Sequence, residues 1–375
     1  MADTLYFSRD TKVFIKIGSD IWEVPVLDGF SFSQATNTSE ITLNEMSDTS
    51  GDSRRGRQMF TDSYAPAEWS FSTYARPFAS AGSGGGKADT SAKHHAVEEV
   101  LWALMVGAAT YSSYSFTGFT ADTTDLDITF AQSNKTTLGT ADIYFEMGGA
   151  GSGTKTIYKI AGCCVNEASL DFDIDGIATI NWSGMGTLIS EDSAQTATVY
   201  EGVSGTSNFI RNRLTTLVMT TADDHLLAAG ESADGDSDVE TYDLVLTGGN
   251  ITVSNNITFL TPETLGVVNQ PLGHVTGTRS VSGSFTCYLN AEASSSADLF
   301  ERIIEDTDTI TNNFDLTFKV GGASATPRIE LAMTDCHLEV PTHSIDDVIS
   351  LETNFHALPS TISGTDELTI KYVGA

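Results

Sequence analysis

An internal repeat constrains the fold of this chain more than any other feature of its sequence. Short segments of the first half recur in the second half in the same order, and the shared order is the evidence. The matched pairs are residues 29–33 with 250–254, 69–74 with 283–288, 145–149 with 318–322, and 173–176 with 344–347. Such a pattern indicates one structural unit present twice. We therefore predict two tandem domains, 1–200 and 201–375.

The local pattern within each copy is mainly that of β-strands. Apolar residues alternate with polar ones, as in Val13, Ile15 and Ile17, which places the apolar side chains on one face of a strand. A helical spacing of apolar residues occurs at 96–105, and a second short helix is expected near 299–304. The fold class predicted is mainly β, a β-rich α+β chain whose two domains are β-sandwiches or small barrels, each with one flanking helix.

The charge balance excludes a protein that binds nucleic acid through clustered cations. The chain has 19 Lys and Arg against 50 Asp and Glu, a formal net charge of −31. Both halves are acidic, and neutralising phosphates requires clustered Lys and Arg. Such a chain would repel DNA, which suits both a smooth conduit for DNA and a highly soluble protein.

Cysteine usage and the chain start suggest a protein made in a reducing cytoplasm. Cys163, Cys164, Cys287 and Cys336 form no Cys-x-x-Cys pair and no disulfide framework, so reduced and partly buried thiols are expected. The start lacks a signal peptide, and the longest apolar run, near 100–109, is shorter than the roughly 20 residues that span a bilayer. No membrane association and no cofactor are expected.

Several segments resemble the tail tube proteins of long-tailed bacteriophages, the siphophages. In the first half these are residues 39–43, Arg54-Arg-Gly-Arg57, Phe60 and 68–78, and in the second half 261–266, 269–273 and 277–288. The resemblance implies a two-sheet β-sandwich with a flanking helix and a long loop that contacts the next ring. It also implies inner sheets that join into a barrel around a DNA channel. The duplication is similar to the minority of these proteins in which one chain supplies two tube domains.

An alternating acidic stretch is the main candidate for the surface of that channel. Asp171, Asp173 and Asp175 alternate with Leu170, Phe172 and Ile174, and Asp346 and Asp347 occupy the matching place in the second copy. We expect these five carboxylates to face the lumen. Residues 171–176 also open like a calcium loop, but the twelfth position is Trp182 where a carboxylate is needed. A strand with one acidic face explains the pattern better, and no metal is expected.

The long loops of the two copies are the candidates for contact between rings. The loop predicted at residues 44–66 carries the basic cluster Arg54, Arg55 and Arg57, which is either solvated or in contact with an acidic surface of the adjacent ring. The matching loop of the second copy carries Leu265, Val267 and Val268, an apolar tip that favours burial in an interface.

These features predict a structural virion protein with no catalytic site. Neither His94-His95 nor residues 223–225 have a second ligand cluster, and no nucleophile elbow occurs. We expect homotrimeric pseudo-sixfold rings that stack into a tail tube, assembled in the bacterial cytoplasm. Other tail proteins would bind the tube ends, and DNA would pass without specific binding. The alternatives are a capsid decoration protein, a tail terminator or a baseplate-hub relative, and, less favoured, a glycoside hydrolase that uses carboxylates.

Overall fold

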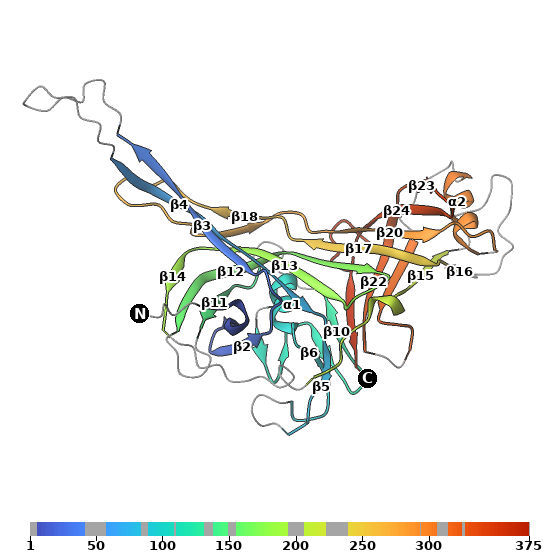
Figure 1. Cartoon of the computed structure of the whole chain (residues 1–375), viewed down its shortest axis with the longest axis horizontal. Helices are drawn as coiled ribbons and strands as arrows, with labels where there is room; N and C mark the ends of the chain where they lie inside the picture. The colour runs from blue at the N-terminus through green and yellow to red at the C-terminus, as the bar shows by residue number, and fades with distance from the viewer. Residues whose placement is uncertain are drawn as a thin grey trace, which may run out of the picture.

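The computed structural model describes most of the chain. The described residues are 6–41, 58–83, 89–108, 110–130, 138–148, 155–193, 206–222, 239–292, 294–305, 314–324 and 327–374. The chain is mainly β, as predicted, and its strands run through both halves as one hydrogen-bonded system (Figure 1). The predicted boundary at residue 200 lies outside the described residues.

One antiparallel sheet runs through both halves and is called here the polar sheet. Its order is β3-β4-β13-β12-β17-β20-β24-β23, each strand pairing with the next. The bounds are β3 Ser31–Glu40, β4 Met59–Tyr74, β13 Thr179–Gly186, β12 Thr156–Asp173, β17 Leu246–Ser254, β20 Ser280–Tyr288, β24 Ile349–Ala357 and β23 Thr342–Ile345. The two halves meet in it where β12 pairs with β17.

A second layer packs against one face of the polar sheet in each half. In the first half its order is β2-β1-β11-β12-β14, and in the second it is β16-β15-β21-β22-β25, which continues into β10 and β9 of the first half. The bounds are β1 Lys12–Ile17, β2 Asp20–Val24, β11 Ala141–Met147, β14 Ile189–Glu191, β15 Thr216–Ala222, β16 Val239–Asp243, β21 Phe314–Val320, β22 Arg328–Leu338, β25 Thr369–Val373, β9 Phe119–Ala121 and β10 Asp125–Thr129.

The second half repeats the pairing order of the first. The long strand β12 passes through both layers: its N-terminal part pairs with β11 and β14, and its C-terminal part with β13. Strand β22 does the same with β21, β25 and β24. The remaining elements are η1 Ser8–Asp10, β5 Pro77–Ala79, β6 His94–Ala96, α1 Glu99–Val106, β7 Tyr111–Ser112, β8 Ser115–Phe116, η2 Asn212–Leu214, β18 Ile257–Leu260, β19 Gly273–Thr276 and α2 Ser296–Glu305.

The first helix lies inside the molecule. We predicted a helix at 96–105 with one apolar stripe, but α1 begins at Glu99 and all 8 of its residues are buried. It ends at Val106 and is capped by Gly107, whose φ of 84° gives the left-handed conformation that closes a helix with little strain. Trp102 of α1 packs edge-on against Trp182 of β13, with ring centroids 4.8 Å apart. The helix therefore fills the space between the layers, where a single apolar stripe would not suffice.

The halves are joined by more than the β12–β17 pairing. Strand β25, at the end of the chain, pairs with β10 of the first half, from Asp125 opposite Val373 to Thr129 opposite Thr369. The buried side-chain amide of Asn255 donates to the carbonyl oxygens of Met105 and Val165, at 3.0 and 3.2 Å. The polar sheet is thus continuous across this junction, and the second layer of the second half takes in β10 and β9 of the first half.

Candidate assembly surfaces

The exposed face of the polar sheet carries small polar and acidic side chains. Its strands alternate, so that residues such as Phe71, Trp182 and Phe285 are buried while their neighbours point outward. The outward residues are mainly Ser, Thr and Asn. The exposed carboxylates on these strands are Glu68, Glu167, Asp171, Asp173 and Glu352, with Glu40 and Asp62 on the extension of β3 and β4.

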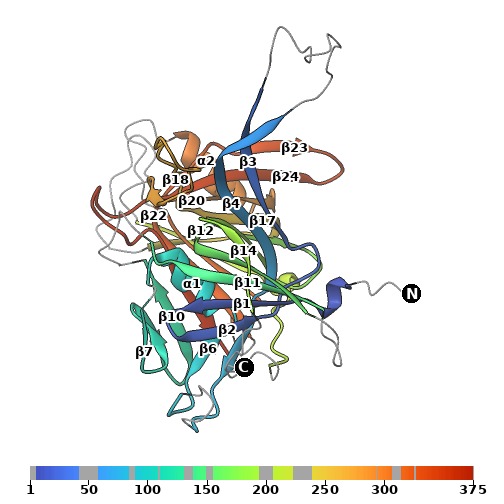
Figure 2. The same cartoon turned by 90° about the vertical axis from the view of Figure 1, so that its left-hand side faces the viewer.

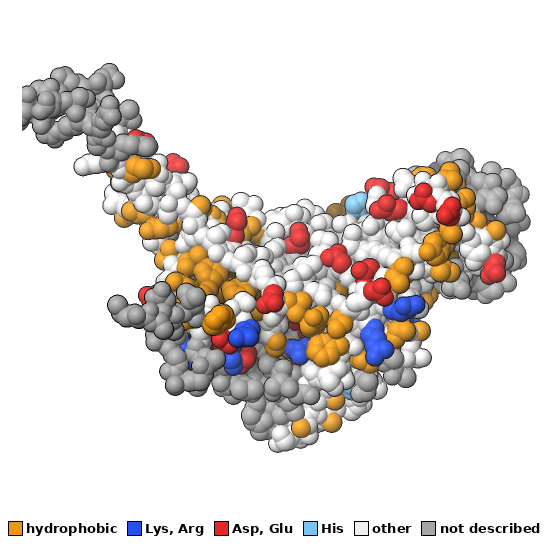
Figure 3. Space-filling model, viewed as in Figure 1, with side chains coloured by type: hydrophobic (Ala, Val, Ile, Leu, Met, Phe, Trp, Pro, Cys, Tyr) orange, Lys and Arg blue, Asp and Glu red, His pale blue; other side chains and the backbone are white. Residues whose placement is uncertain are grey.

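Lys and Arg are absent from this face. The strands of the polar sheet contain no Arg and a single lysine, Lys159, which lies in the part of β12 that belongs to the second layer. The second layers hold the lysines of the sheets, where Lys12 pairs with Glu23 at 3.1 Å and Lys371 with Asp127 at 3.2 Å. Figure 3 shows acidic side chains spread across the upper half of the molecule and Lys and Arg below them. The two layers therefore differ in charge as well as in position.

The predicted acidic residues divide into two groups. Asp171 and Asp173 lie on the exposed face of β12, and Asn181 donates to Asp171 at 3.1 Å. Asp175 lies in the turn after β12, where its Oδ1 is 3.8 Å from the guanidinium of Arg213. Asp346 and Asp347 lie in the turn between β23 and β24. Leu170 and Phe172 are buried as expected, but the prediction for Ile174 was wrong. Ile174 is exposed because β12 ends at Asp173.

Two arms project from the end of the polar sheet opposite those turns. The first arm is the extension of β3 and β4, residues 35–41 and 58–66, and the second arm is residues 256–279, which include β18 and β19. Both lie at the left of Figure 1, and Figure 2 shows the first arm extending beyond the body. The loop predicted at 44–66 is shorter than expected, since residues 59–66 belong to β4. Arg54, Arg55 and Arg57 lie outside the described residues.

The two arms are joined to each other by main-chain hydrogen bonds. The backbone amide of Asn269 donates to the carbonyl oxygen of Asp62 at 3.1 Å. The backbone amide of Tyr64 donates to the carbonyl oxygen of Asn269 at 2.9 Å. The amide of Thr264 donates to the Asn269 side chain at 2.8 Å, which shapes the loop around it. The long segments of both halves, distant in sequence, therefore lie side by side.

The arms expose a group of large apolar side chains. Leu265 is fully exposed, and Val267 and Val268 are exposed as well, so the apolar tip expected from the sequence is present. The structure adds Phe60 of the first arm and Leu272 of the second. In the sequence, Phe60 is an aromatic residue within a polar stretch. Its exposure could not be predicted, because it follows from the extension of β4, which the sequence did not indicate. A surface of this kind is typical of an interface.

The polar sheet also has an unpaired edge on each side. Among the described residues, β3 pairs only with β4, and β23 pairs only with β24. Unpaired edges offer rows of backbone donors and acceptors to another chain. Free sheet edges are expected of such a sandwich, but sequence alternation gives no order of strands, so it does not say that β3 and β23 form them.

The four cysteines are unreactive thiols within the body of the protein. The four cysteines are free and buried, and burial raises the pKa of Cys164 to about 12 and that of Cys287 to about 11, so these two are thiols. Among the described residues, no group of three or more His, Cys, Asp or Glu is placed to hold a metal ion. None of the described helices is long and apolar enough to cross a membrane.

Free sheet edges, projecting arms with apolar tips and a polar face without Lys or Arg are typical of a protein that assembles with copies of itself. The model of the phage tail tube protein family matches residues 35–357. The chain is also 29% identical, over 379 residues, to tail tube protein pb6 of Escherichia phage T5, an alignment that covers 97% of this chain and 75% of that relative.

The chain therefore belongs to the phage tail tube protein family. It is a structural protein of the virion tail of a long-tailed bacteriophage, which self-assembles into a tube and contacts other tail proteins. Membership in a structural family implies a role that is not enzymatic.

Proposed function

We propose that three chains close each ring of the tube, with the two halves of each chain as adjacent units of a pseudo-sixfold ring. The β12–β17 pairing carries this proposal. It joins residues 167–173 of the first half to residues 248–254 of the second through a full antiparallel register. If one unit-to-unit contact has this form within the chain, the matching strands form it between chains. The units correspond to domains 1–200 and 201–375.

The repeat identifies the strands that meet between chains. Strand β3 matches β17, and the end of β22 together with β23 matches the end of β12. The two unpaired edges of the polar sheet are therefore the counterparts of β12 and β17, which pair with each other within the chain. Glu167 lies opposite Ser254 within the chain. Trp182 of the first half matches Phe355 of the second. Trp182 lies opposite Ala168 and Phe355 lies opposite Leu338, so Ala168 matches Leu338 and Glu167 matches His337. This alignment places His337 of one chain opposite Ser33 of the next.

The exposed face of the polar sheet then lines the channel. Closing these sheets into a ring gives a barrel whose interior carries Ser, Thr and Asn with Glu68, Asp171 and Asp173. A wall without cations gives DNA phosphates nothing to adhere to, so DNA passes during ejection without specific binding. Asp175, Asp346 and Asp347, which lie in turns at the end of the sheet, line the mouth of each ring.

The arms stack the rings in this proposal. They leave the sheet at one end, and the acidic turns lie at the other, so rings stacked head to tail bring the arms of one ring to the turns of the next. The apolar side chains of Leu265, Val267 and Val268 become buried there. The basic residues Arg54, Arg55 and Arg57 add charge complementarity to that contact.

A cysteine-pair experiment tests the ring. The variant Ser33→Cys/His337→Cys, oxidised after assembly, should give covalent dimers and trimers on non-reducing gels, since the chain's own four cysteines are buried. The matched control is Ser33→Cys/Asn354→Cys, in which the second cysteine lies one strand further from the edge. Equal crosslinking of both pairs, or tubes without crosslinks in either, would contradict the proposed edge. Negative-stain images without rings or tubes would favour the decoration, terminator or hub alternatives.

A further inference from the structure

The second half of the chain begins with a turn that rests on the first half. This turn contains η2 and lies against the β12–β13 turn. The backbone amide of Asn212 donates to the carbonyl oxygen of Gly176 at 3.2 Å, and the backbone amide of Ala178 donates to the carbonyl oxygen of Ile210 at 2.8 Å. The contact leaves Ile210 fully buried. Within the chain, a short turn at the start of one unit therefore holds that unit to the next.

The first half begins with the same turn. Each turn makes two main-chain hydrogen bonds at the same spacing, from Asp10 to Phe7 and from Thr11 to Ser8 in η1, and from Leu214 to Arg211 and from Thr215 to Asn212 in η2. The strands that follow have the same register, since β1 places Lys12 opposite Glu146 and β15 places Thr216 opposite Lys319. Glu146 and Lys319 are themselves matched by the repeat. The turn with η1 is therefore the counterpart of the turn with η2.

The first turn, residues 6–11, is left open in its own chain. Tyr6 is 45% exposed, whereas its counterpart Ile210 is fully buried. The turn between β23 and β24, which holds the place of the β12–β13 turn in the second half, is open too, with Ile345 and Val348 exposed. The first turn lies toward the left of the body in Figure 1 and the β23–β24 hairpin at the right, while Figure 2 shows both on the same side. Closing the ring brings them together from neighbouring chains.

We propose that the first turn of each chain binds the β23–β24 turn of the neighbouring chain in the same ring. The inference rests on the proposed ring. Within a chain, Arg211 forms a β-bridge with Ile177, and with the turns aligned as in the repeat their counterparts are Phe7 and Val348. Phe7 is 54% exposed and Val348 is 59% exposed in the single chain. The contact therefore takes two apolar side chains out of water.

A charge pair indicates the same partner. Within the chain, Arg213 lies 3.8 Å from Asp175. Their counterparts in the repeat are Arg9 of the first turn and Asp346 of the β23–β24 turn, and both are exposed. An exposed pair of this kind adds little affinity, but it favours this acidic turn over other surfaces as the partner of the first turn.

Side chains rather than main-chain hydrogen bonds are expected to carry the contact between chains. The β23–β24 hairpin extends further than the β12–β13 turn, because Ile345 still pairs with Ile349, whereas the last pair of β12 and β13 is Asp171 with Thr179. The hairpin thus uses for its own ladder the kind of backbone groups that the β12–β13 turn gives to η2. Substitutions of side chains can therefore test the contact.

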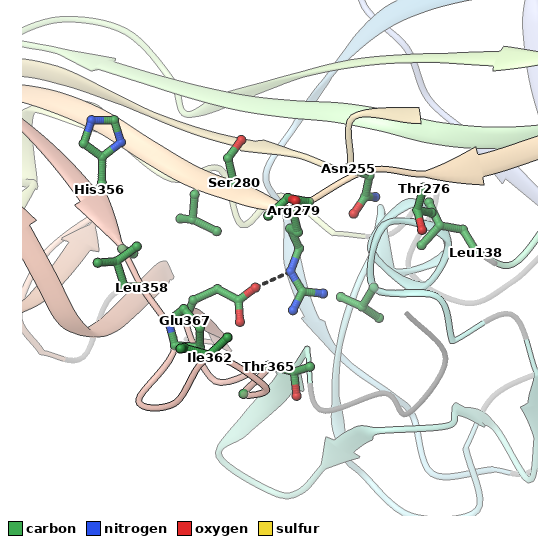
Figure 4. Close-up of a pocket in the computed structure, with 17 residues that line it drawn as sticks. Leu138, Asn255, Thr276, Arg279, Ser280, His356, Leu358, Ile362, Thr365 and Glu367 are labelled. Carbon is green, nitrogen blue, oxygen red and sulfur yellow. Dashed lines mark hydrogen bonds and ion pairs between the residues drawn. The ribbon is translucent and has the colours of Figure 1, made fainter. Parts of the chain in front are cut away.

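A pair of cysteines provides the first test. Phe7→Cys/Val348→Cys, oxidised in isolated rings, should give covalent dimers and trimers, since the chain's own four cysteines are buried. The counterpart Ile177→Cys/Arg211→Cys should lose its two new thiols without forming a covalent oligomer. The control is Phe7→Cys/Ile362→Cys, which should not crosslink. Ile362 is fully exposed, but it lies beyond the far end of β24, at a cavity of about 440 Å³ (Figure 4).

The outcomes separate this contact from the ring itself. Rings that crosslink through Ser33→Cys/His337→Cys but not through Phe7→Cys/Val348→Cys would overturn the contact and leave the ring standing. Crosslinks of the second pair in tubes but not in isolated rings would overturn it too, because the two turns would then meet between rings. Failure of both pairs to crosslink would overturn the proposed ring, and this contact with it.

Exchange of the charged pair provides an independent measurement. Arg9→Glu should raise the concentration at which rings dissociate about fivefold, and Asp346→Arg added to it should restore the native value. Glu292→Arg, which reverses another exposed carboxylate of the second half, should not restore it. Thermal unfolding of the unassembled chain should be the same for all of these variants, because the substituted side chains are exposed. Equal recovery with Glu292→Arg would show a general effect of charge and would contradict the contact.

Discussion

Glu98 is the buried charge that links the helix, the chain end and the rest of the first half. Tyr372 of β25 donates its hydroxyl to Glu98 at 2.6 Å and accepts the indole N–H of Trp102 at 2.7 Å. The backbone amide of Arg76 also donates to the carboxylate, at 3.1 Å. Desolvation raises the pKa of Glu98 to about 7, although these hydrogen bonds and the Arg76 charge oppose it.

This environment predicts a pH-dependent difference between the native chain and Glu98→Gln. Because the folded pKa lies above the ordinary value of 4.5, the folded chain holds the proton more tightly than the unfolded chain. That stabilisation is fully present below pH 4.5 and is lost as the pH rises through 7. The free energy of unfolding of the native chain, measured against the variant, should fall by about 3 kcal/mol between pH 4 and 8. Parallel profiles would show that Glu98 does not titrate there.

Residue-scale predictions succeeded where a local period decides the outcome. Leu170 and Phe172 are buried opposite Asp171 and Asp173 because a strand alternates whatever its neighbours are. They failed where the end of an element or a tertiary contact decides. Ile174 lies beyond the last residue of β12, and the burial of α1 on every side depends on two layers that the sequence of the helix does not specify.

Among the elements, the apolar tip of the second arm is an exposed structure whose loss should spare the fold. Leu265 is fully exposed, and Val267 and Val268 are exposed for a large part, so a substitution there removes little packing. The triple variant Leu265→Ser/Val267→Ser/Val268→Ser should therefore change the free energy of unfolding by less than about 0.5 kcal/mol. Its tubes, counted and measured by negative-stain microscopy, should be short or absent, because ring stacking loses its apolar contact. Tubes of native length would exclude these residues from the stacking interface.

The polar sheet predicts the behaviour of assembled tubes toward DNA. If the polar sheet lines the channel as proposed, native tubes should show no DNA retention at any salt concentration, because the outward face of that sheet has no Lys or Arg. The variant Glu68→Lys/Asp171→Lys/Asp173→Lys should assemble and retain short DNA at low salt, and it should release that DNA as the salt concentration rises. The control is a variant with three lysines introduced on the second layer, which should not retain DNA inside the tube. Equal retention by the two lysine variants would place Glu68, Asp171 and Asp173 outside the channel.

The sequence predicted strand and helix content and the repeat, but not how the elements connect the two halves. The matched segments at 69–74 and 283–288 became β4 and β20, neighbours of the junction strands. The pairing of β25 with β10 joins residues 369–373 to 125–129, and no local pattern indicates such a contact. The placement of Asn269 against Asp62 is of the same kind, since it depends on the fold of both arms.

For the whole molecule, the two kinds of unit-to-unit contact in a ring would be unequal. Within a chain, the halves are joined by two strand pairings, β12–β17 and β25–β10. Between chains, the β10 region has no counterpart of similar length after α2, so the polar sheet and the arms carry the contact. Rings should therefore dissociate into intact chains before the halves of a chain separate.

A cross-section of the assembled tube by cryo-electron microscopy tests the central claim most directly. The account predicts three chains in each ring, six sandwich units around one barrel, and the exposed face of the polar sheet toward the channel. Six chains in each ring, with one half of every chain outside the wall, would contradict it.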